Sequence, residues 1–225
     1  MERWVRGTVL TAALTGMILS NLFIDLGYAQ RWLDLAELIF LVVAVVRFSG
    51  YSREELGLGG EFSLLKHVLF PLAFFILPLV PVLFVPHRSV SPKIFALYFL
   101  NYLLIAGLPE ELLFRALLFA SFEERFSGIT ALVGNSVIHW LIHFGVGLNM
   151  SQLMAALVLS SYRLTFRRIE PLIIAHALWD AVFIALKPSF VGSWSLVIMA
   201  PFAGAFLSIL IYLAGRSQQI ELSVG

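Results

Sequence analysis

The sequence predicts an all-α protein, a bundle of about seven to eight transmembrane helices forming a single transmembrane domain over residues 1–225. Of its residues 60% are hydrophobic and only 13% are charged, and the mean hydropathy is +0.93. A soluble domain has about a quarter of its residues charged. So few charges cannot cover a water-exposed surface, so we expect lipid to solvate much of it. The connections between apolar stretches are short, and no linker or internal repeat divides the chain.

A helix needs about 20 mostly apolar residues to cross a bilayer. The expected helices are about 7–25, 34–47, 64–85, 94–120, 129–147, 151–162, 171–186 and 194–214. Three of them are short and either extend into flanking residues or cross only in part. The first could serve as a secretory signal, but it is long for one and further helices follow, so we expect it to be retained. The polar stretch 51–65 is expected to be a solvated connection.

Lysine and arginine predict the orientation, because cytoplasmic loops carry more of them. With the N-terminus inside, the inner loops hold Arg3, Arg6, Arg47, Arg53, Arg125, Arg163, Arg167, Arg168 and Arg216, and the outer loops hold Arg31, Arg88, Lys93 and Lys187. We therefore expect an integral membrane protein with both termini in the cytoplasm; an odd number of helices would move one terminus outside. No basic run is long enough to follow a phosphate backbone, so nucleic acid is not an expected partner. The apolar composition makes membrane lipid an expected partner.

The chain has no cysteine, which excludes disulfides, thiolate catalysis and cysteine-ligated metal sites. Ionisable groups at the centre of an apolar helix each cost roughly 2.5–3.5 kcal/mol on insertion scales. Such groups usually face the interior of a bundle and mark a functional site. Here they form three clusters, all in the second half of the chain.

The first cluster is Pro109, Glu110, Glu111 and Arg115. Proline lacks an amide donor and suits a first helical turn, so we expect a break near Gly107 and a new helix from Glu110. Glu111 and Arg115 are four residues apart and can pair on one face, whereas Glu110 points about 100° away. This pairing would leave Glu110 available for chemistry. The alternative is a helix end at the interface with a surface ion pair.

The other two clusters contain histidine. His139 and His143 are four residues apart on one expected helix face, a spacing common among metal ligands. His176 and Asp180 repeat this spacing on another helix. Each pair could instead form hydrogen bonds between helices. Together, the clusters place carboxylates and imidazoles on three helices, and a carboxylate shielded from water beside histidines has the components of a general-base site.

Three known types of intramembrane protease do not fit the sequence. An HExxH zinc protease needs Glu beside its first His, where this chain has Trp140. A serine rhomboid protease needs Gly-x-Ser-Gly, but Val137 follows Gly134-Asn135-Ser136. An aspartyl type needs Gly-x-Gly-Asp, but Leu148 follows Gly147.

The set Glu110-Glu111-x-x-x-Arg115, a histidine in the next apolar helix, and His176-x-x-x-Asp180 resembles the three motifs of the CPBP family. That family includes CAAX prenyl endopeptidases of the Rce1 type and bacterial Abi proteins, and its pattern is EExxxR, FxxxH and HxxxN. The order and spacing agree over about residues 95–190, the expected catalytic core. Two residues differ. His139 stands at the family's Phe, so His143 takes the catalytic position, and Asp180 stands at the family's Asn.

The resemblance implies that Glu110 and His143 activate a water molecule, that His176 and Asp180 stabilise the oxyanion, and that Glu111 and Arg115 support the site. An ionised Asp180 only accepts hydrogen bonds and would repel an oxyanion. It would have to be protonated, orient His176 or bind a metal. The family has been argued to be both glutamic and metal-dependent. A glutamic mechanism needs no cofactor, whereas a metal mechanism would place zinc on ligands drawn from His139, His143 and His176.

The expected function is therefore that of a membrane-embedded endopeptidase that cleaves a peptide or a membrane-anchored protein near the membrane surface. The small size and the lack of extra domains suggest a prokaryotic member in the cell inner membrane. The alternative is a non-catalytic scaffold or immunity protein, or a metal or ion carrier that uses the same groups. A carrier would usually show paired broken helices, and only one broken segment is expected here.

Overall fold

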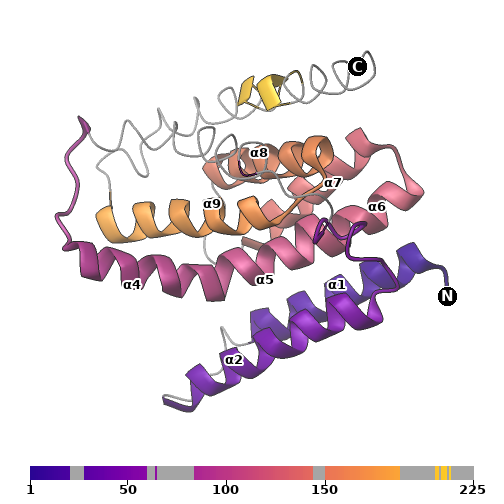
Figure 1. Cartoon of the computed structure of the whole chain (residues 1–225), viewed down its shortest axis with the longest axis horizontal. Helices are drawn as coiled ribbons and strands as arrows, with labels where there is room; N and C mark the ends of the chain where they lie inside the picture. Colours follow the sequence, from indigo (N-terminus) through magenta and orange to yellow (C-terminus); the bar gives the residue numbers. More distant parts are fainter. Residues whose placement is uncertain are drawn as a thin grey trace.

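A computed structural model describes residues 1–20, 28–59, 64, 84–143, 150–187, 206–207, 209–211 and 213, and within them all the regular structure is helical (Figure 1). The elements are α1 (Arg3–Ser20), α2 (Tyr28–Val43), η2 (Ala44–Phe48), α4 (Pro92–Tyr102), η5 (Leu103–Gly107), α5 (Leu108–Glu110), η6 (Glu111–Leu118), α6 (Phe119–Arg125), α7 (Gly128–Leu141), α8 (Met150–Phe166), α9 (Glu170–Ala181) and η8 (Val182–Leu186), where η marks a π-helical segment. The all-α prediction is confirmed.

The expected helix 64–85 and most of 194–214 lie outside the described residues. None of the helices in the described part of the chain combines the length and the apolar character that crossing a lipid bilayer requires.

One helical path runs without interruption from α4 to α6 and carries the first cluster. It begins at Pro92 behind an N-cap at Ser91, whose hydroxyl oxygen accepts a hydrogen bond from the Ile94 amide at 3.3 Å. The break expected near Gly107 was wrong, since the backbone there stays in the right-handed helical region. Two π-helical segments surround Pro109, and the Leu108 amide donates to the carbonyl of Leu103, five residues back. Proline has no amide hydrogen to donate, and these wider turns let the helix continue past it.

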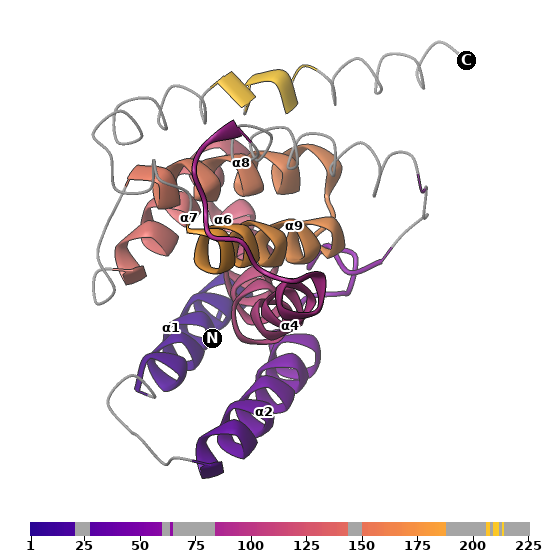
Figure 2. The same ribbon diagram turned by 90° about the vertical axis from the view of Figure 1, so that its left-hand side faces the viewer.

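Helix α9 lies directly against this path, because Gly107 has no side chain to keep it away. A Cβ atom on Gly107 would lie 2.6 Å from the Ile173 carbonyl oxygen and 3.3 Å from the Ala177 Cβ. Figures 1 and 2 both show α9 running along α4 and α5. This close approach brings the third cluster next to the first.

Helices α7 and α8 form a close pair joined by small polar side chains. The buried Asn135 amide nitrogen donates to the Ser160 hydroxyl at 2.9 Å, and the Ser136 hydroxyl donates to the Ala156 carbonyl at 3.1 Å. Hydrogen bonds between buried helix faces restrict the rotation of each helix about its axis. They therefore help to fix the direction in which α7 presents the second cluster.

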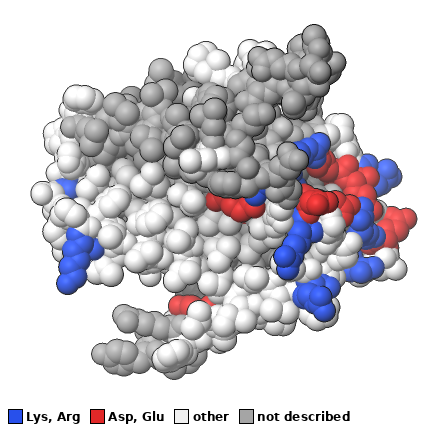
Figure 3. Space-filling model, viewed as in Figure 1, with Lys and Arg blue, Asp and Glu red and all other residues white. Residues whose placement is uncertain are grey.

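The charged residues gather at one end of the molecule, where α1 begins and α6 ends (Figure 3). Arg3 pairs there with Glu55 and with Glu124, both at 2.9 Å. The hydrogen bond from the Ser52 amide, together with Arg3, holds the pKa of Glu55 below its usual value. Burial raises the pKa of Tyr51, whose hydroxyl donates to Glu124 at 2.8 Å, to about 12.

The loop over residues 51–59 is anchored to this end at its buried positions, whereas residues 52–55 are exposed, so the expected solvated connection holds for 52–55 and is wrong for the buried positions. Leu56 is fully buried, and the Gly57 carbonyl accepts a hydrogen bond from the Ile169 amide at 3.1 Å. Arg163 is buried beside Gly57 and donates from its Nε to the Arg115 carbonyl at 2.9 Å. The loop thus anchors the connection between α8 and α9 to the helix that carries the first cluster.

Candidate active site

Three histidine rings from two other helices surround the carboxylate of Glu110. The Oε2 atom of Glu110 lies 2.7 Å from Nε2 of His139. The same oxygen lies 4.0 Å from Nε2 of His143 and 3.7 Å from Nε2 of His176. The side chain of Glu110 is 23% exposed, whereas that of Glu111 is fully buried. Glu110 is therefore the carboxylate of the pair that an incoming molecule can reach.

The end of α7 sets the orientation of the two histidines of the second cluster. His139 is nearly buried against the Phe114 ring, with 4.8 Å between ring centroids. His143 lies in the short helical turn after α7, and its Nδ1 is 2.8 Å from the His139 carbonyl oxygen. Nδ1–H would donate to that carbonyl, which leaves Nε2 directed toward Glu110.

Beneath Glu110, a buried set of charges holds His176. Its Nδ1 lies 2.8 Å from Oε1 of Glu111, and the same oxygen is 3.2 Å from a guanidinium nitrogen of Arg115. Glu111 and Arg115 are fully buried, so each needs the other as a counter-charge. Glu111 therefore couples the first cluster to the third and fixes the ring of His176.

Asp180 lies at the open side of the same cluster. Its Oδ2 is 3.6 Å from Nε2 of His176, and its side chain is 35% exposed. That distance is too long for a direct hydrogen bond. Orienting His176 was one of the roles that the sequence left open for Asp180. In the structure Glu111 makes the direct contact with His176 instead.

The site also offers a set of metal-ligand atoms. One ligand atom from each of Glu110, His139 and His143 lies within 4.8 Å of the others. Two imidazoles and one carboxylate are a donor set that zinc binds in hydrolases. Of the three histidines named from the sequence, the structure groups His139 and His143 with Glu110 in this set.

The fold thus brings together all seven side chains predicted from the sequence: Glu110, Glu111, Arg115, His139, His143, His176 and Asp180. Their roles stay predictions. Sequence reasoning did not foresee the short contact between His139 and Glu110 or the bond between Glu111 and His176. It also missed Arg163, which was assigned only to an inner loop although it is buried against the Arg115 backbone.

A helical core that places a partly exposed carboxylate among three imidazoles has the composition of a hydrolytic centre, and a protease is the class that this site suggests. Residues 92–182 match the family described as type II CAAX prenyl endopeptidase Rce1-like. Over these residues the chain is similar to that family, which confirms the resemblance drawn from the three motifs. The match begins at the first residue of α4 and ends just after α9. Comparisons with curated proteins and with solved structures found no match.

Proposed function

We propose that this protein is a membrane-embedded endopeptidase in which Glu110 and its histidines activate a water molecule. One observation carries the proposal: Nε2 atoms of three histidines lie within 4.0 Å of a single Glu110 oxygen. The family match supports the reaction class. The buried ion pair of Glu111 and Arg115 is proposed to hold the site in shape.

In the reaction, the Glu110 carboxylate takes a proton from water while the water oxygen attacks the peptide carbonyl carbon. When Nδ1 of His143 donates to the His139 carbonyl, its Nε2 carries a lone pair and can accept the second hydrogen bond of that water. The tetrahedral intermediate then collapses, the C–N bond breaks, and Glu110 returns its proton to the leaving amine. This sequence balances with water as the only co-reactant.

His176 is the proposed oxyanion stabiliser. In its doubly protonated form it donates from Nδ1 to Glu111 and from Nε2 toward the developing oxyanion. Asp180 flanks the same nitrogen and accommodates substrate most readily when it carries a proton or accepts a hydrogen bond from a peptide amide. His139 holds Glu110 in place through the 2.7 Å contact.

The membrane location is part of the proposal, with both termini in the cytoplasm of a prokaryotic cell and a peptide or membrane-anchored protein as substrate. It is supported by the composition and by a stripe of apolar side chains on the outer face of α4 and η5, each about half exposed. These residues are Ile94, Leu97, Leu100, Leu104 and Ile105. Exposed apolar stripes of this kind are costly in water and are stable against acyl chains.

Zinc-dependent hydrolysis at the same site is a second candidate mechanism, favoured by the mutual closeness of ligand atoms from Glu110, His139 and His143. A zinc ion held there would act as a Lewis acid on the substrate carbonyl or on water. The residues fit zinc in type, and His143 has the backbone partner at Nδ1 that a ligating imidazole usually has. Zinc content separates the mechanisms: a metal-dependent site loses bound zinc in purified His139→Phe and Glu110→Gln, and zinc retained in both variants contradicts it.

The test of the proposed function compares membranes from cells that produce the wild type or Glu110→Gln. Newly formed peptide N-termini of membrane proteins are labelled and identified by mass spectrometry. We expect a set of N-termini that depends on the wild type and falls at least about 100-fold with Glu110→Gln or His143→Ala, the usual scale for a lost general base. Glu54→Gln, at an exposed carboxylate outside the site, serves as control.

If Glu110→Gln and His143→Ala leave the N-termini unchanged at normal protein levels, the enzyme proposal is wrong. The result would then favour the non-catalytic scaffold.

A further inference from the structure

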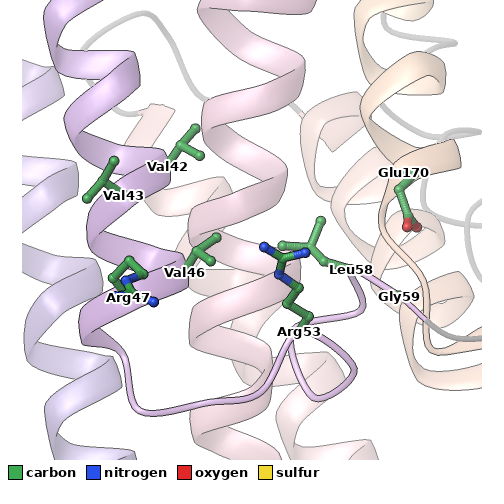
Figure 4. Close-up of a pocket in the computed structure, with 8 residues that line it drawn as sticks. All are labelled: Val42, Val43, Val46, Arg47, Arg53, Leu58, Gly59 and Glu170. Atoms are coloured by element: carbon green, nitrogen blue, oxygen red, sulfur yellow. The ribbon is translucent and has the colours of Figure 1, made fainter.

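A groove outside the active site lies between the end of α2 and the 51–59 loop (Figure 4). Its volume is about 480 Å³. Val42, Val43 and Val46 line it from the helix, and Leu58 lies toward Val46 from the loop. Figures 1 and 2 show α2 on the side of the molecule away from α8, so the groove opens at the periphery of the bundle.

Three charged side chains line the polar part of the groove, and only one of them is neutralised within the described residues. Glu170 pairs with Arg168 at 2.8 Å. Arg47 and Arg53 are exposed and make no ion pair among the residues that the structure describes. By contrast, Arg3 and Arg167 each pair with a carboxylate. The groove therefore presents two uncompensated guanidinium groups beside an apolar wall.

This combination matches an amphiphilic anion. Guanidinium groups bind phosphate through paired hydrogen bonds and keep their charge under all cellular conditions. The valine wall continues onto an exposed apolar surface of the same helix, where Phe40 is 55% and Phe48 is 63% exposed. A soluble phosphate ester would use the arginines and leave this surface uncovered, whereas a phospholipid would use both.

We propose that this groove binds an anionic phospholipid, with the headgroup phosphate on Arg47 and Arg53 and an acyl chain along Val42, Val43 and Val46. The inference rests on the membrane location in the proposed function. Basic pockets at the cytoplasmic ends of membrane helices recognise anionic headgroups in this way. Because the groove borders Glu170, the first residue of α9, a bound lipid would lie at the start of the helix that carries His176.

The test measures thermal unfolding of the purified full-length protein in detergent micelles with added lipid. Phosphatidylglycerol should raise the midpoint by at least about 3 °C more than phosphatidylcholine does, the scale expected of a ligand well above its dissociation constant. We expect the Arg47→Gln/Arg53→Gln double variant to lose this difference. Arg125→Gln, at an exposed arginine outside the groove, should retain it.

Equal shifts with both lipids, or a full phosphatidylglycerol shift in the double variant, would overturn the proposal. The same shift with inorganic phosphate alone would assign the site to a free anion and also overturn it. Glu110→Gln should respond to phosphatidylglycerol as the wild type does, because it leaves the groove intact. A failure of proteolysis and a failure of lipid binding are thus separate results.

Discussion

The contact between His139 and Glu110 arises at one of the two positions where this site departs from the motifs of the matched family, which has phenylalanine there. A hydrogen bond to a charged group contributes about 1.5–3 kcal/mol. His139→Phe keeps a ring against Phe114 and removes this bond. We expect the wild-type-dependent N-termini to form about 10- to 100-fold more slowly in this variant. The measurement is a time course of their appearance after induction, and an unchanged rate would show that His139 does not hold Glu110.

The buried pair of Glu111 and Arg115 predicts a stability effect that is separate from catalysis. Arg115→Met removes the counter-charge of a fully buried carboxylate, a change that costs about 3–5 kcal/mol. Denaturant unfolding in micelles should therefore show a large decrease in the free energy of unfolding of Arg115→Met. Arg167→Met breaks an exposed pair with Glu123 and should cost less than about 1 kcal/mol. Equal losses in the two variants would contradict the structural role given to Arg115.

At the level of residues, the sequence predicted the members of the site better than their partners. The spacing of four residues within each cluster placed His139 with His143 and His176 with Asp180, because a helix repeats its face at that interval. Which group meets which across helices depends on helix rotation and separation, and these follow from tertiary packing. For this reason spacing alone could not show that His176 bonds to Glu111 and not to Asp180.

At the level of elements, the position of α9 depends on the absence of a side chain at Gly107. Gly107→Ala would place a Cβ 2.6 Å from a backbone oxygen of α9, so the helices must separate. We expect a loss of about 1–3 kcal/mol in stability, the usual cost of overpacking, and a fall in cleavage because His176 moves from Glu110.

Gly16→Ala in α1 is the matched control, because a Cβ there meets nothing within 4 Å. Alanine is the better helix former by up to about 1 kcal/mol, so this variant should be as stable as the wild type or more so. Thermal unfolding and the labelled N-termini are measured for both variants. Retention of full stability and cleavage in Gly107→Ala would show that α9 does not depend on this close approach.

In the described part of the chain, the existence of the helices was predictable from apolar length, but the course of the backbone at Pro109 was not. Local rules place a break where an amide donor is missing. The structure instead inserts π-helical turns, and the surrounding side chains of η6, from Glu111 to Leu118, are all buried. Burial along the whole segment favours an uninterrupted helix over a local break. Pro109 and Gly107 therefore do mark a special position in the helix. Around Pro109 the helix widens into π-helical turns, and at Gly107 it makes a close contact with α9.

At the level of the whole molecule, charged residues gather at the end where α1 begins and α6 ends, and arginines that the sequence assigned to the inner side of the membrane lie there in the described part of the chain (Figure 3). Arg3 at the start of α1 contacts Glu55 in the 51–59 loop and Glu124 at the end of α6. Arg88 lies at the opposite end, beside the last residue of η8, and its amide donates to the Leu186 carbonyl. The orientation proposed from lysine and arginine places this basic end on the cytoplasmic side.

The chain's lack of cysteine makes this orientation directly testable, since a single introduced thiol is the only one present. Ser52→Cys and Ser89→Cys place exposed thiols at the basic end and at the opposite end. In intact spheroplasts, a membrane-impermeant maleimide should label Ser89→Cys and should label Ser52→Cys only after lysis. The reverse pattern would invert the orientation, and labelling of both thiols before lysis would contradict a spanning protein. Because the reagent reports position alone, this result holds whether or not the site proves to be catalytic.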